Sequence, residues 1–132
     1  MRRERGQLVL ETTDYKILQT VSLLNEKNIY PLNECVFRIL IGDDTDEVIQ
    51  FKELPTYKTL ISINQKKVSR YVVMLVRYKY LVRIYDETTD EMYLKIAPLG
   101  EMELTKYLKN RRYKYVKKKV KIKPLYIVLE KN

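Results

Sequence analysis

The chain has 132 residues, 45% of them hydrophobic, one cysteine, no histidine and a formal net charge of +9. This length favours one compact domain, and a single cysteine excludes an internal disulfide. The lack of histidine excludes the Ser-His and Cys-His nucleophile pairs and most catalytic zinc sites. We therefore expect a protein that is not an enzyme and needs no cofactor or metal.

The positive charge is concentrated near the C-terminus. Of the 26 Lys and Arg residues, ten lie between Lys106 and Lys123, a segment without any Asp or Glu. The remaining 16 are balanced by all 17 acidic residues. A concentrated positive field favours polyanions such as nucleic acid. No apolar run approaches the roughly 20 residues that cross a bilayer, so we expect a cytoplasmic protein with no membrane contact, associated with the nucleoid if bacterial.

The first elements are a short strand or arm at Gln7–Leu10 and a helix that ends near Lys27. Thr13 or Asp14 is the expected N-cap of this helix. Its spacing predicts a buried stripe that comprises Ile17, Leu18, Val21, Leu24 and Tyr15.

A second helix is expected after Pro31, with Asn33 as its cap and Gly42 at its end. Its apolar face comprises Val36, Phe37, Ile39 and Leu40. The acidic stretch 43–47 is interpreted as a solvated loop, with a calcium loop as the alternative; it lacks the central Gly and terminal Glu of such a loop. Val48–Leu60 is expected to hold a short helix or turn, interrupted by Pro55.

A third helix, capped by Ser62 or Asn64, is expected to run to about Tyr78. Its apolar stripe comprises Val68, Tyr71, Val72, Leu75 and Val76. The opposite face carries Lys66, Arg70, Val73 and Arg77.

A β-hairpin with strands 80–85 and 92–96 follows, and we expect Gly100 to end it. A fourth helix over 101–110 is anchored by Met102, Leu104 and Leu108. The alternation of Val120 and Ile122 with lysines then predicts a β-prone tail with one basic face. This strand could pair with 7–10 or with the hairpin.

Three helices followed by a hairpin, with the third helix basic on its outer face, predict an α+β winged helix with a C-terminal helix and a basic β-prone tail. The expected division is an N-terminal arm at 1–12, the winged-helix domain at 13–110 and a basic extension at 111–132.

Within this order, five segments resemble the RQC winged helix of RecQ-type DNA helicases. They are YKILQTVSLL, CVFRILIGDD, FKELPTYKTLIS, VSRYVVMLVRYKYL and MYLKIAPLG. The resemblance implies a stand-alone protein that binds duplex or branched DNA. The helicase motor is absent from the chain, so a helicase or another protein would act as a partner.

The resemblance and the basic tail together define the expected DNA-binding residues. The resemblance implies phosphate contacts by Lys58, Lys66, Lys67, Ser69 and Arg70. The charge pattern and the hairpin add Arg77, Tyr93, Lys109, Arg111, Arg112, Tyr113, Lys114, Lys117, Lys118 and Lys119. The alternative function is a protein-interaction winged helix, or a module that binds RNA or the ribosome through the basic tail.

Overall fold

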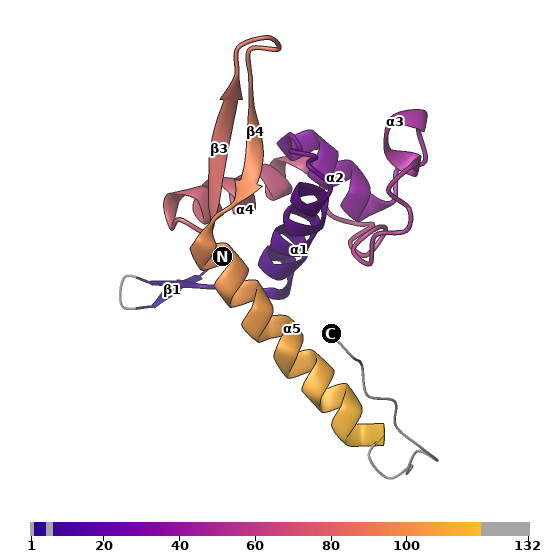
Figure 1. Cartoon of the computed structure of the whole chain (residues 1–132), viewed down its shortest axis with the longest axis vertical. Helices are drawn as coiled ribbons and strands as arrows, with labels where there is room; N and C mark the ends of the chain where they lie inside the picture. Colours follow the sequence, from indigo (N-terminus) through magenta and orange to yellow (C-terminus); the bar gives the residue numbers. More distant parts are fainter. Residues whose placement is uncertain (1, 5–6, 120–132) are drawn as a thin grey trace, which may run out of the picture.

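The computed structural model describes residues 2–4 and 7–119. The elements are β1 (Arg2–Glu4), β2 (Gln7–Val9), α1 (Thr12–Glu26), α2 (Asn33–Ile41), α3 (Asp46–Ile49), α4 (Gln65–Arg77), β3 (Leu81–Asp86), β4 (Glu91–Ile96) and α5 (Pro98–Lys119). Figure 1 shows α1, α2 and α4 packed together, with the β3–β4 hairpin projecting at one end and α5 extending away from the other. This α+β order of helices followed by a hairpin is compatible with the predicted winged helix.

The three larger helices pack through the apolar stripes that the sequence predicts. The fully buried residues of these stripes are Ile17, Leu18, Val21, Leu24, Val36, Ile39, Leu40, Val68, Val72 and Leu75. Leu81 and Leu94 at the base of the hairpin join the main cluster. A second cluster forms where Val48, Phe51 and Leu54 cover the ends of α1 and α2. The predicted short helix or turn after residue 48 thus closes one end of the core.

Each of α1, α2 and α4 is followed, within two residues of its last residue, by a residue in the left-handed region of backbone space. These residues are Asn28 (φ 62°), Gly42 (φ 79°) and Lys79 (φ 69°). The N–H that follows each one donates to a carbonyl five residues earlier, as from Tyr80 to Leu75 at 2.9 Å. This arrangement satisfies helix-end carbonyls and turns the chain sharply. Gly42 confirms the predicted helix end.

A side chain of α1 holds the outer edge of β4. The Ile96 N–H donates to Oδ1 of Asn25 at 2.8 Å, and Nδ2 of Asn25 donates to the carbonyl of Leu94 at 3.4 Å. The Leu94 N–H donates to the Pro31 carbonyl at 2.8 Å. Asn25 therefore takes the place of a neighbouring strand and orients the hairpin on the helices.

The hairpin forms in an antiparallel register that pairs Leu81 with Ile96 and Ile84 with Tyr93. Because successive side chains alternate between faces, Leu81 and Leu94 point into the core while Val82 and Ile84 are exposed. The two predicted strands are confirmed: the first lies one residue later than predicted, and the second starts one residue earlier and ends at Ile96 as predicted. Strand β2 confirms the predicted N-terminal strand, and it pairs with β1 in a second antiparallel pair.

The prediction that Gly100 lies between the hairpin and a separate helix is wrong. Gly100 lies inside α5, where an added Cβ would meet the carbonyl oxygen of Tyr80. The helix begins at Pro98, whose fixed φ suits a first helical position. Leu104 is buried and Leu108 packs against the core, as predicted, but Met102 is 52% exposed.

Helix α5 also extends further than predicted, because it continues without a break to Lys119. The segment 111–119 is therefore helical rather than part of a β-prone tail. Lysine and arginine are good helix formers, so the segment favours helix once a packed first half has nucleated it. The strand predicted from Val120 onward lies outside the described residues.

Two expected N-caps are wrong, by two or three residues for α1 and by one residue for α2. Helix α1 begins at Thr12 after Glu11, because the Glu11 N–H donates to Oδ2 of Asp14 at 2.7 Å. Helix α2 follows Leu32, and Asn33 is its first residue. The acidic stretch is also only partly a loop, since Asp46 and Glu47 form the first turn of α3. Acidic side chains in a first turn are favoured by the helix dipole.

None of the helices in the described ranges has both the length and the apolar character needed to cross a membrane. Helix α5 has 22 residues, but eight of them are Lys or Arg.

Removing the Asn25 amide should loosen the hairpin. In Asn25→Leu, the Ile96 N–H and the Leu94 carbonyl lose their partner, and one buried unpaired group costs about 1–3 kcal/mol. We expect the free energy of unfolding in urea to fall by about 2–4 kcal/mol. The Ile96 amide should also exchange faster with solvent. Glu26→Ala, an exposed change on the same helix, is the control; equal stability of the two variants would contradict the assigned role.

Asp14 should make stability depend on pH. Its side chain is fully buried and Oδ1 has no partner, so burial raises the carboxyl pKa from 3.8 to about 6. The folded state therefore binds the proton more tightly than the unfolded state, and stability is lost as pH rises from about 4 to about 6. The loss is about 3 kcal/mol. Asp14→Asn cannot titrate at this position. The free energy of unfolding of the variant, measured in urea, should therefore rise relative to that of the native chain as pH increases. A pH-independent difference would contradict this.

Candidate nucleic-acid interface

Helix α4 separates an apolar face from a basic face. It starts at Asn64, whose Oδ1 accepts the Lys67 N–H at 2.8 Å, so the predicted cap at Asn64 is confirmed. Val68, Val72 and Leu75 turn inward against α1 and α2. The opposite side is left to solvent. The backbone N–H of Lys67 donates to the Asn64 side chain, so only the side-chain ammonium of Lys67 is available to bind an anion.

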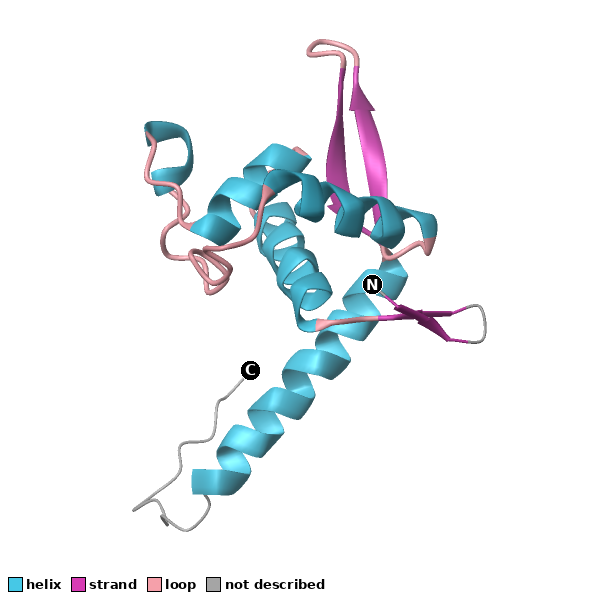
Figure 2. Ribbon diagram, turned by 180° about the vertical axis from the view of Figure 1, so that it is seen from behind, coloured by secondary structure: helices cyan, strands magenta, loops and turns pink. Residues whose placement is uncertain are grey.

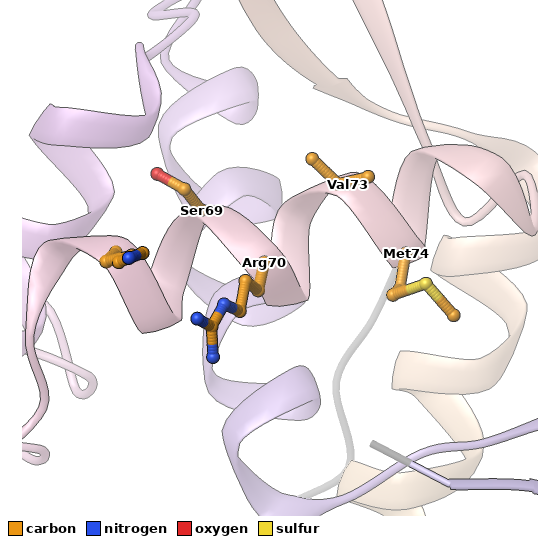
Figure 3. Close-up of a pocket in the computed structure, with 5 residues that line it drawn as sticks. Ser69, Arg70, Val73 and Met74 are labelled. Atoms are coloured by element: carbon orange, nitrogen blue, oxygen red, sulfur yellow. The ribbon is translucent and has the colours of Figure 1, made fainter.

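The outer side of α4 carries an open groove with a volume of ≈ 530 Å³. We call it the α4 groove, and it is lined by Lys66, Ser69, Arg70, Val73 and Met74. Figure 3 shows Ser69 and Val73 along one edge of this outer face and Arg70 and Met74 along the other edge. Figure 2 shows the hairpin standing beside this helix. Three of the predicted DNA-binding residues, Lys66, Ser69 and Arg70, therefore lie together.

The cations of α4 have no acidic partner among the residues that the structure describes. The helix contains four Lys or Arg residues and no Asp or Glu. Among residues 8–109, whose side chains the structure describes, the ion pairs involve only Arg38 and Lys106 as cations. A lysine or arginine without a carboxylate partner keeps its full charge for an external anion.

Arg38 is the opposite case. Its guanidinium lies 2.6 Å from Glu34, 3.2 Å from Glu47 and 3.6 Å from Asp43. The hydrogen bond to Glu47 raises the pKa of Arg38. Two residues of the acidic stretch, Asp43 and Glu47, therefore neutralise the charge of Arg38. No three carboxylate or thiol groups in the described part of the chain are arranged to hold a metal ion.

The other residues expected near the third helix are more dispersed. Lys67 is exposed in the first turn of α4, and Arg77 is exposed in its last turn. Lys58 belongs to the loop between α3 and α4, and this loop packs against the C-terminal end of α2. The Lys58 N–H donates to the Ile39 carbonyl at 2.8 Å. It has a left-handed φ of 61°, and its side-chain stem occupies the space next to Gly42.

Tyr93 lies on the hairpin and not in the α4 groove. Its hydroxyl donates to Thr89 at 2.9 Å, and the Tyr85 hydroxyl donates to Asp90 at 2.7 Å. Asp86 accepts bonds from the N–H of Thr88 and the hydroxyl of Thr89. The tip is thus ordered by its own acidic residues, and its negative charge opposes contact with phosphate.

The remaining predicted residues lie on α5, apart from the groove. Lys109 is exposed at the end of the packed half of this helix. Beyond it, the helical backbone carries Arg111, Arg112, Tyr113, Lys114, Lys117, Lys118 and Lys119. Figure 1 shows that this half of α5 projects away from the other helices. Apart from Lys58, the structure therefore places the predicted cations on two elements, α4 and α5.

Two groove residues were not assigned by the sequence. Val73 is apolar yet 45% exposed, and Met74 completes the groove beside it. The sequence did hold a signal for Val73, because it is an apolar residue on the basic face of the third helix. Cys35, by contrast, packs against the second cluster, and burial raises its thiol pKa to about 11. It is therefore a protonated packing residue at neutral pH.

Comparisons with protein-family models, curated proteins and solved structures found no match to this chain.

Proposed function

We propose that the protein is a winged-helix protein that binds duplex or branched DNA through phosphates, similar to the RQC branch. The observation that carries the proposal is the outer face of α4, where Lys66, Lys67, Arg70 and Arg77 have no carboxylate partner within the described residues. Nucleic-acid backbones supply the complementary charge, and phosphate contacts give most of the non-specific affinity.

The arrangement of elements supports this mode of binding. Helices α1 and α2 brace α4 from behind, so its basic face is presented as a rigid unit. The hairpin is fixed next to it through Asn25. In such an arrangement the outer helix lies against the duplex while the hairpin reaches a neighbouring part of it. Because the tip is acidic and would be repelled by phosphate, we propose that the hairpin contacts DNA through its sides rather than through its end.

The basic half of α5 would extend the positive surface. Eight Lys or Arg residues lie between Lys106 and Lys119, and no acidic residue lies among them. A helix with this composition attracts any polyanion without regard to sequence. We propose that this half of α5 attracts the polyanion and that the α4 groove determines how the protein is oriented on it.

Charge reversal in the groove tests the proposal. In Lys66→Glu with Arg70→Glu, both exposed side chains become repulsive to phosphate, so affinity for a short duplex should fall on the order of tenfold or more. If about six cations engage in the native protein, log affinity falls with log salt at a slope of roughly −5, and the variant slope should be shallower by about 2. Fluorescence anisotropy over a salt series measures both.

The matched control changes the same charge elsewhere. Lys27 and Lys52 are exposed and lie outside α4 and α5, so Lys27→Glu with Lys52→Glu alters net charge equally. This control should keep most of the affinity. Equal losses in the two variants would show that net charge alone governs binding, and a slope near zero in the native protein would exclude phosphate-directed binding.

The competing function is a module that binds RNA or an acidic protein through the basic C-terminal segment. Truncation after Asn110 separates the two functions, because the packing residues Leu104 and Leu108 precede the cut. We expect the truncated chain to keep its melting temperature within a few degrees and to retain duplex binding at reduced affinity. Complete loss of nucleic-acid binding with an intact fold would favour the competing function.

A further inference from the structure

Val73 interrupts the basic face of α4 with an exposed apolar surface. It lies three residues after Arg70 and four before Arg77, which places all three on one side of the helix. Val73 is 45% exposed and borders the α4 groove together with Met74. The groove is therefore apolar along part of its wall and cationic on its rim.

The chemistry of the DNA major groove matches this combination. Phosphates line its edges, and the C5 methyl of thymine is an apolar group that projects into it. A helix drawn to the phosphates by flanking cations brings an apolar side chain in the middle of its face close to the base edges. Valine has few rotamers to lose, so the contact costs little side-chain entropy.

We infer that Val73 contacts a thymine methyl in the major groove and gives the protein a preference for A·T pairs. The inference rests on the proposed function, because it requires α4 to face the duplex. It adds a contact with a base edge to binding that otherwise depends on phosphates.

The test removes only the methyl group from the DNA. Affinity is measured at one salt concentration for a short A·T-rich duplex and for the same duplex with every thymine replaced by deoxyuridine. Charge and base pairing are the same in both. Burial of one methyl is expected to give the native protein about fourfold tighter binding to the thymine duplex.

Two variants locate the effect. Val73→Ala should bind both duplexes alike, near the affinity of the native protein for the deoxyuridine duplex. Val82→Ala is the matched control, because Val82 on β3 is similarly exposed, at 42%. It should keep the fourfold ratio. Both substitutions are at exposed positions, and thermal unfolding verifies that each variant is folded.

The outcomes separate this inference from the proposed function. Salt-dependent binding with equal affinity for the two duplexes overturns the methyl contact and leaves phosphate binding intact. Loss of the ratio in Val82→Ala but not in Val73→Ala also overturns it, because the contact would then lie on the hairpin. Absence of binding to either duplex overturns the proposed function itself.

Discussion

The position of the hairpin depends on one carboxamide. Asn25 accepts a bond from the Ile96 N–H and donates to the Leu94 carbonyl, while the Pro31 carbonyl accepts the Leu94 N–H. Two strands alone form a marginal sheet, and an open edge invites pairing with another chain. The edge of β4 is covered at its base, so the hairpin becomes an extension of the helical core. The geometry between α4 and the hairpin follows from this contact and from the tight turn at Lys79.

The basic residues of the described chain fall into two classes with different consequences. Arg38 is held by Glu34, Asp43 and Glu47, and its charge organises the chain around α3. The cations of α4 lie on a helix without acidic residues. Total charge does not distinguish these classes, because both contribute equally to the sum. The position of each acidic residue relative to the helix decides which cations remain available.

The sequence predicts the parts of the fold where the apolar periodicity agrees with the residues that begin or end helices and strands. The stripe of α4, its Asn64 cap, the Gly42 terminus and the two hairpin strands are examples. It fails at the starts of α1 and α5, where an unusual cap residue or a tertiary contact decides which residues are helical. Glu11 begins α1 because Asp14 reaches back to its N–H, and Gly100 is helical because it fits against the Tyr80 carbonyl. The first contact is local, but glutamate is not among the preferred N-cap residues. The second contact is tertiary and has no local signature, since a glycine after a strand equally suggests a turn.

The candidate interface follows the same division. The spacing of Lys66, Arg70, Val73 and Arg77 places them on one face, because 3.6-residue periodicity fixes which side chains lie opposite the buried stripe. The groove formed by Ser69, Val73 and Met74 depends on side-chain packing along α4, which periodicity does not describe. The separation of the α4 cations from those of α5 likewise depends on the direction in which α5 leaves the core. The sequence predicts both groups but not how far apart they lie.

The projecting half of α5 couples its own folding to its electrostatic surroundings. Its backbone is helical to Lys119, and Arg111, Lys114 and Lys118 recur at spacings of three and four. Like charges at these spacings destabilise a helix by a few tenths of a kcal/mol per pair. A bound polyanion would cancel this repulsion, so the helix would gain stability as it binds. Ionic strength would then have two opposite effects on this segment, because added salt relieves the repulsion within the helix and would weaken attraction to a bound polyanion.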